Sequence, residues 1–154
     1  MCGITGFFNI PEISNSKSID SLFESISHRG PDLNKHFVEE NSIYFLFSRL
    51  SIIDLSSAGD QPMISKSGNS IIIFNGEIYN HLEIRDKINK DLKISWNGHS
   101  DTETLLESIE YYGIDILNEI RGMYSICFYD RKKNQLILIN DRFGEKPLYY
   151  SINE

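Results

Sequence analysis

The stretch Ile71-Ile72-Ile73-Phe74-Asn75-Gly76-Glu77 decides the fold that this sequence predicts. Its first four residues are apolar and do not alternate with polar ones, and the runs Ile43–Phe47 and Leu136–Ile139 share this pattern. A strand of this kind is covered on both of its faces. We therefore expect an α+β fold in which two sheets pack on each other and helices cover the outside.

The segments around that stretch supply the other elements. Strands are also expected at Gly3–Ile10, Phe37–Val38, Met123–Tyr129, Gln135–Asn140 and Leu148–Ser151. Apolar residues at helical spacing predict helices near residues 19–26, 80–88, 100–112 and 116–120. Asn80 is expected to cap the second helix, and Ser100 with Glu103 to form a capping box for the third. The polar turn Arg131–Asn134 predicts an antiparallel hairpin, which argues against a parallel doubly wound sheet.

Composition limits the class of protein. The chain has 154 residues, enough for one domain, and 40% of them are hydrophobic. A net charge of −7 argues against nucleic acid or an anionic membrane as the main partner. The two cysteines, Cys2 and Cys127, do not make a disulfide framework, and Cys127 is predicted to be an inert core thiol. We expect no signal peptide, no metal site, and a reducing compartment such as the cytoplasm.

Cys2 directly follows the initiator methionine. If Met1 is removed, this residue carries both a thiol and a free α-amine, whose usual pKa of about 7.7–8.0 suits a general base. A terminal amine that activates its own side chain is a known form of nucleophilic catalysis. Taken alone, however, the pattern fits a small buried residue at the start of a strand better.

Arg49 and Asp101 are charged residues with two interpretations each. Arg49 interrupts an apolar segment, so it either holds a ligand carboxylate or pairs internally with an acid such as Asp54 or Asp60. Asp101 stands at the start of a predicted helix, where it either holds a ligand ammonium group or complements the helix dipole.

The Asn75-Gly76 pair also allows two interpretations. An amide side chain and an accessible backbone N–H can form an oxyanion hole. Asn-Gly is equally the strongest two-residue hairpin signal, and local sequence alone favours that turn. A thiol, an oxyanion hole, a cation for a carboxylate and an acid for an ammonium together fit one substrate, an α-amino acid with a side-chain amide. These residues therefore predict glutamine hydrolysis.

Seven motifs in one order carry a resemblance to a known family: Met1-Cys2-Gly3-Ile4-Thr5-Gly6, Arg29-Gly30-Pro31-Asp32, Arg49-Leu50-Ser51-Ile52-Ile53-Asp54, Gln61-Pro62-Met63, Asn75-Gly76-Glu77-Ile78-Tyr79-Asn80, Ser100-Asp101-Thr102-Glu103 and Asp141-Arg142-Phe143-Gly144. Together they resemble the class II glutamine amidotransferase domain of the glutamine-hydrolysing asparagine synthetases. The resemblance runs over essentially all of residues 1–154. It implies the N-terminal-nucleophile hydrolase fold, a four-layer αββα sandwich of two antiparallel sheets.

The resemblance also implies a role for each site residue. Cys2 is expected to be the nucleophile, with its own amine as the base. The Asn75 side chain and the Gly76 N–H are expected to hold the oxyanion. The remaining binding residues it implies are Arg49 for the substrate carboxylate, Asp101 for the ammonium group, and Glu77, Ile52 and Ile53 as pocket lining.

The same resemblance implies the partners. Family members continue into a synthetase domain that uses ATP and magnesium to consume the ammonia, so this domain is expected to need no cofactor of its own. The expected partners are L-glutamine and a synthetase domain, in a longer chain or as a separate subunit, and a homodimer is allowed. Two alternatives stay open: a non-catalytic module that binds glutamine or acts as a scaffold, and an N-terminal-cysteine hydrolase of other amides.

Overall fold

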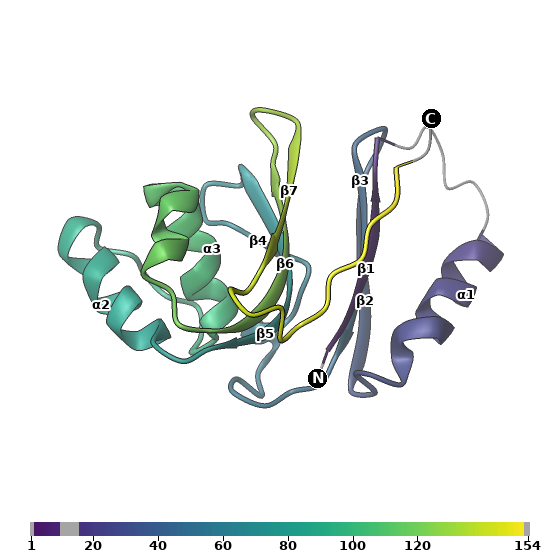
Figure 1. Cartoon of the computed structure of the whole chain (residues 1–154), viewed down its shortest axis with the longest axis horizontal. Helices are drawn as coiled ribbons and strands as arrows, with labels where there is room; N and C mark the ends of the chain where they lie inside the picture. Colours follow the sequence, from purple (N-terminus) through teal and green to yellow (C-terminus); the bar gives the residue numbers. More distant parts are fainter. Residues whose placement is uncertain (1, 10–15, 153–154) are drawn as a thin grey trace.

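The computed structural model describes residues 2–9 and 16–152, which form two antiparallel sheets with helices on their outer faces (Figure 1). The first sheet has the order β1-β3-β2, and the second has the order β4-β5-β6-β7. The strands are β1 (Gly3–Phe8), β2 (Leu33–Glu39), β3 (Ile43–Arg49), β4 (Met63–Ile64), β5 (Ser70–Ile78), β6 (Gly122–Asp130) and β7 (Gln135–Asn140). The α-helices are α1 (Ser16–Ser27), α2 (His81–Asp91) and α3 (Asp101–Tyr112), and two short 3-10 helices are η1 (Ser57–Gly59) and η2 (Ile114–Asn118).

The layers form because the strands carry apolar residues on both faces of each sheet. Figure 1 shows α1 outside the first sheet, and α2 with α3 outside the second. In β5, Ile71 and Ile73 pack against the first sheet, whereas Ile72 and Phe74 pack under α3. Because both faces of this strand are covered, its apolar residues need not alternate with polar ones. The predicted four-layer sandwich is confirmed.

Several local predictions are wrong. Leu138 is 38% exposed because β7 is the edge strand of its sheet. Residues 148–151 form no strand, and the predicted helix near 116–120 is the 3-10 helix η2. The part of β1 predicted at Ile10 lies outside the described residues, as does Met1.

The predicted helix caps are also only partly correct. The Ser100 hydroxyl accepts a hydrogen bond from the Thr102 N–H, as a cap should. The carboxylate of Glu103 does not complete a capping box, because it binds the N–H groups of Asn97 and Gly98 instead. The Asn80 side chain does not cap α2 and instead bonds the backbone of Glu119 and Arg121.

No helix among the described residues combines the length and apolar character that crossing a membrane requires. The hairpin of β6 and β7 forms as predicted, with Asp130 opposite Gln135. Cys127 is partly buried in the apolar layer between the sheets, where burial raises the pKa of its thiol to about 12. The prediction of an inert thiol agrees with this environment, since the thiolate is the reactive form.

Candidate active site

One pocket contains every residue that the sequence predicts for the site. It lies where β1 begins, β3 ends, β5 ends and α3 begins. The predicted residues that line it are Cys2, Arg49, Ile52, Ile53, Asn75, Gly76, Glu77 and Asp101. They come from four separate parts of the chain, so the fold itself creates this proximity.

Cys2 is held at the pocket by contacts to both of its polar parts. The Leu50 N–H donates to the Cys2 sulfur over 3.4 Å, and Arg29 Nε donates to the Cys2 carbonyl over 3.2 Å. Burial raises the pKa of the Cys2 thiol, while the Leu50 hydrogen bond and the charge of Arg49 act in the opposite direction. Because the net shift is upward, this thiol needs a base before it can act as a nucleophile.

Arg49 ends β3 and is 7% exposed. Its guanidinium donates to the carboxylate of Asp60 and to the backbone carbonyls of Asp54 and Ser56. The internal pair with Asp60 is therefore present, yet the side chain also lines the pocket. These contacts account for three of the five N–H donors of a guanidinium. A Cβ on Gly59 would lie 2.7 Å from Arg49 Nη2, so a larger residue there would require the guanidinium to shift.

Asn75 and Gly76 lie inside β5, opposite Ser125 and Tyr124 of β6. The turn that local sequence favours is therefore wrong. Asn75 is 5% exposed, and its side chain makes no hydrogen bond to any other described residue, so its amide is available to a ligand. A Cβ on Gly76 would lie 2.1 Å from the Met123 carbonyl oxygen. Glycine is required there for β5 and β6 to pair.

Asp101 is the first residue of α3 and is 5% exposed. Its carboxylate accepts hydrogen bonds from the N–H groups of Ile78 and Thr102, each over 2.9 Å. Burial raises the pKa of Asp101 to about 6 despite these two donors, and the charge of Glu77 adds to the increase. Asp101 therefore both contacts the helix start and presents a carboxylate to the pocket, where Glu77 provides a second one.

Comparison with known proteins shows the family of the whole chain. A family model described as a glutamine amidotransferase domain matches residues 1–154. The chain belongs to this family. Among its relatives is asparagine synthetase [glutamine-hydrolyzing] 2 of Bacillus subtilis, 36% identical over 98% of this chain and 20% of the relative. Asparagine synthetase B [glutamine-hydrolyzing] of Escherichia coli is 31% identical over 100% of this chain and 27% of the relative. Amidase chry2 of Gibberella zeae is also 31% identical, over 100% of this chain and 24% of the relative.

The chain spans about a fifth to a third of the length of the curated relatives it matches. The relatives named as asparagine synthetases are thus longer chains in which the amidotransferase domain is one part.

The pocket is also lined by residues that sequence reasoning did not assign. Gln61 is 4% exposed and joins β5 to α3, because its amide accepts from the Phe74 N–H and donates to the Thr102 hydroxyl. Lys146 lines the pocket and is 6% exposed. Gln61 lies in the motif Gln61-Pro62-Met63, so the sequence marks it, but the motif alone does not indicate what the side chain does. Lys146 follows the Asp141 motif by a short distance, and nothing in its local sequence indicates burial.

Asp141 holds the segment that brings Lys146 to the pocket. Its carboxylate accepts hydrogen bonds from four backbone N–H groups, those of Tyr124, Phe143, Glu145 and Lys146, over 2.9–3.1 Å. Burial alone would raise the pKa of Asp141, but these donors lower it to about 2. The carboxylate is therefore ionised at neutral pH and fixes the turn after β7.

Proposed function

We propose that this domain hydrolyses L-glutamine to L-glutamate and ammonia through a thioester on Cys2. The observation that carries the proposal is the gathering of a thiol, an uncommitted amide and charged side chains of both signs in one pocket. No described group of three or more histidine, cysteine or acidic side chains is arranged to hold a metal ion. The proposed reaction uses the chain's own residues.

In the proposed complex, the charges of the pocket match the charges of the substrate. Arg49 binds the α-carboxylate of glutamine, because a guanidinium suits a carboxylate in geometry and charge. Asp101 binds the α-ammonium group, and Glu77 adds negative charge beside it. Ile52 and Ile53, which are 68% and 40% exposed, complete the lining from the loop after β3. This arrangement leaves the side-chain amide of glutamine to meet Cys2.

The first half of the reaction forms the thioester. Once Met1 has been removed, the α-amine of Cys2 takes the thiol proton, and the sulfur attacks the amide carbon of glutamine. The amide oxygen becomes negatively charged and accepts hydrogen bonds from the Asn75 side chain and the Gly76 N–H. The protonated amine then gives its proton to the leaving nitrogen, the carbon–nitrogen bond breaks, and ammonia departs.

The second half returns the enzyme to its starting state. The free amine takes a proton from water, whose oxygen attacks the thioester carbon. The same two donors hold the second oxyanion. The carbon–sulfur bond then breaks, the sulfur recovers a proton from the amine, and glutamate leaves. In sum, glutamine and water give glutamate and ammonia.

We further propose that the ammonia is used by an ATP-dependent synthetase domain, which amidates a carboxylate such as aspartate. Support comes from the relatives that are named asparagine synthetases and are three to five times longer than the matched region. Any requirement for ATP and magnesium belongs to that partner. The glutaminase chemistry itself needs neither.

Glutamate release from glutamine tests the proposal. Wild type should release glutamate and Cys2→Ala should not, because alanine has no nucleophile. Cys127→Ala is the matched control, since it removes the other thiol at a position that does not line the pocket. Active protein should begin at Cys2 by intact mass. Equal rates for wild type and Cys2→Ala would refute the thioester mechanism and favour a non-catalytic glutamine-binding module.

A further inference from the structure

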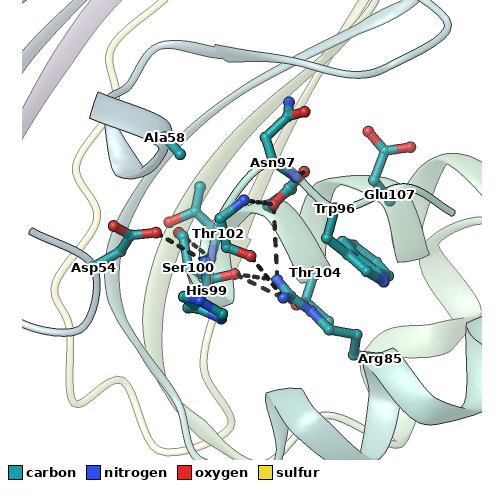
Figure 2. Close-up of polar contacts among 12 residues, drawn as sticks. Asp54, Ala58, Arg85, Trp96, Asn97, His99, Ser100, Thr102, Thr104 and Glu107 are labelled. Carbon is teal, nitrogen blue, oxygen red and sulfur yellow. Dashed lines mark hydrogen bonds and ion pairs between the residues drawn. The ribbon is translucent and has the colours of Figure 1, made fainter. Parts of the chain in front are cut away.

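Arg85 is a buried cation behind the pocket to which the proposed reaction assigns no role. It lies on α2, is 8% exposed and does not line the pocket. Figure 2 shows its side chain reaching from α2 toward Ser100 and Thr104, with the Trp96 ring beside the guanidinium. The guanidinium carbon lies 4.1 Å from the centre of that ring.

The hydrogen bonds of Arg85 go mainly to the segment that leads into α3. Nη1 donates to the Gly98 carbonyl over 2.8 Å, and Nη2 donates to the Ser100 carbonyl over 3.0 Å. Nε donates to the Thr104 hydroxyl over 2.9 Å, within the first turns of α3. The guanidinium therefore fixes two backbone carbonyls directly before Asp101.

Glu103 fixes the same segment through the backbone N–H groups of that segment. Its carboxylate accepts the N–H groups of Asn97 and Gly98 over 2.8 and 3.1 Å, and it lies 3.8 Å from Arg85 Nη2. The Arg85–Glu103 pair thus contacts four backbone groups of residues 97–100. A buried charged pair of this kind is well satisfied, because both partners have further hydrogen bonds.

Residues 97–100, which this pair holds, connect to both of the charged residues that are proposed to bind glutamine, Asp101 and Arg49. The last residue of this segment, Ser100, is followed by Asp101. On its other side, the His99 N–H donates to the Asp54 carboxylate over 2.8 Å, as Figure 2 shows. The Asp54 backbone carbonyl in turn accepts from Arg49. A Cβ on Gly98 would lie 2.4 Å from that same carboxylate, so the segment packs closely on Asp54.

We propose that Arg85 is a positioning residue that sets the places of Asp101 and Arg49 for the two charged groups of glutamine. This inference rests on the proposed binding roles of those two residues. Arg85 does not touch the substrate, and its effect passes through residues 97–100. The proposal predicts that a substitution of Arg85 weakens glutamine binding and leaves the chemistry at Cys2 largely unchanged.

The test compares Arg85→Lys with a matched control, Arg131→Lys. Arg131 makes the same kinds of contact away from the pocket: an ion pair with Glu39 at 2.7 Å, a bond to the Gly68 carbonyl and an aromatic ring, Phe37, at 5.4 Å. Lysine keeps the charge in both variants but lacks the planar set of donors. KM and kcat for glutamine are measured, together with calorimetric binding of glutamine in a Cys2→Ala background.

Arg85→Lys should raise KM and the dissociation constant by about 10- to 100-fold, because small displacements of binding groups have effects of this size. Its kcat should stay within about threefold of wild type, and Arg131→Lys should change neither constant. If Arg85→Lys does not fold, the double variant Arg85→Gln/Glu103→Gln is measured in its place. It removes both charges, so neither partner of the pair leaves an unpaired charge buried. Normal glutamine affinity in a folded variant of either kind, or a fall in kcat alone, would overturn the proposal. The binding experiment is separate from glutamate release, so failure of the proposed hydrolysis is distinguishable from failure of this inference.

Discussion

The raised pKa of Asp101 leads to a specific prediction for the pH dependence of glutamine binding. In its proposed role Asp101 must be ionised to attract the substrate ammonium, and burial raises its pKa to about 6. Below that pH the free site is increasingly protonated, and each further pH unit should weaken binding by up to about tenfold. From these values we expect glutamine to bind about ten times more weakly at pH 5 than at pH 7.

The sign follows from the direction of the pKa shift. A group whose pKa is raised by burial keeps its proton to a higher pH than in water, so affinity is full above about pH 6 and is lost as the pH falls through it. An ordinary aspartate, with a pKa of about 3.9, would leave binding almost constant over this range. Free glutamine keeps both of its charges there and adds no slope.

The assay is calorimetric titration of Cys2→Ala with glutamine between about pH 5 and pH 8, which measures binding without turnover. Asp101→Asn in the same background is the control, and it should bind weakly at every pH with little slope. A wild-type-like slope in Asp101→Asn would assign the titration to another group. A constant affinity between the two ends of the range would refute the assigned role of Asp101.

Three further predictions concern residues around the same pocket. Asn75→Ala should lower kcat by about 10²- to 10³-fold with little change in glutamine affinity, because it removes one oxyanion donor; steady-state kinetics and binding in the Cys2→Ala background separate the two effects. Gly76→Ala places a methyl group 2.1 Å from the Met123 carbonyl in the unshifted backbone, so denaturant titration should show a loss of about 3 kcal/mol or complete unfolding. Asp141→Asn should lower the free energy of unfolding by about 3 kcal/mol at neutral pH, since it takes a charge-assisted acceptor away from four N–H groups; an unchanged midpoint would contradict this.

The sequence was sufficient for the layer architecture because that architecture depends on patterns within each segment. The apolar run Ile71–Phe74 is long enough to show that both faces of one strand are covered. The hairpin of β6 and β7 likewise depends on a local turn. Leu148–Ser151 has strand-forming residues but no strand, because strand formation also needs a partner edge that local sequence does not describe.

The site could be predicted only where several weak signals combined. Local sequence favours a turn at Asn75-Gly76, yet pairing with Ser125 and Tyr124 keeps both residues in β5. This is a contact across about fifty residues, and no pattern within the pair reveals it. The Arg85–Glu103 arrangement could not be predicted for the same reason. Its hydrogen bonds depend on how α2 packs on α3, so in the sequence neither residue differs from an ordinary charge on a helix.

The alternatives posed for Arg49 and Asp101 prove not to exclude each other. Arg49 pairs with Asp60 and lines the pocket, and Asp101 accepts N–H groups at the start of α3 while facing the same pocket. A charged side chain that binds a ligand must lose little freedom on binding, and prior hydrogen bonds to the protein remove that freedom in advance. For Asp101 this arrangement has a cost, since burial destabilises its charged form in the empty site. In the proposed complex, a bound ammonium group would relieve that cost by stabilising the charged form of Asp101.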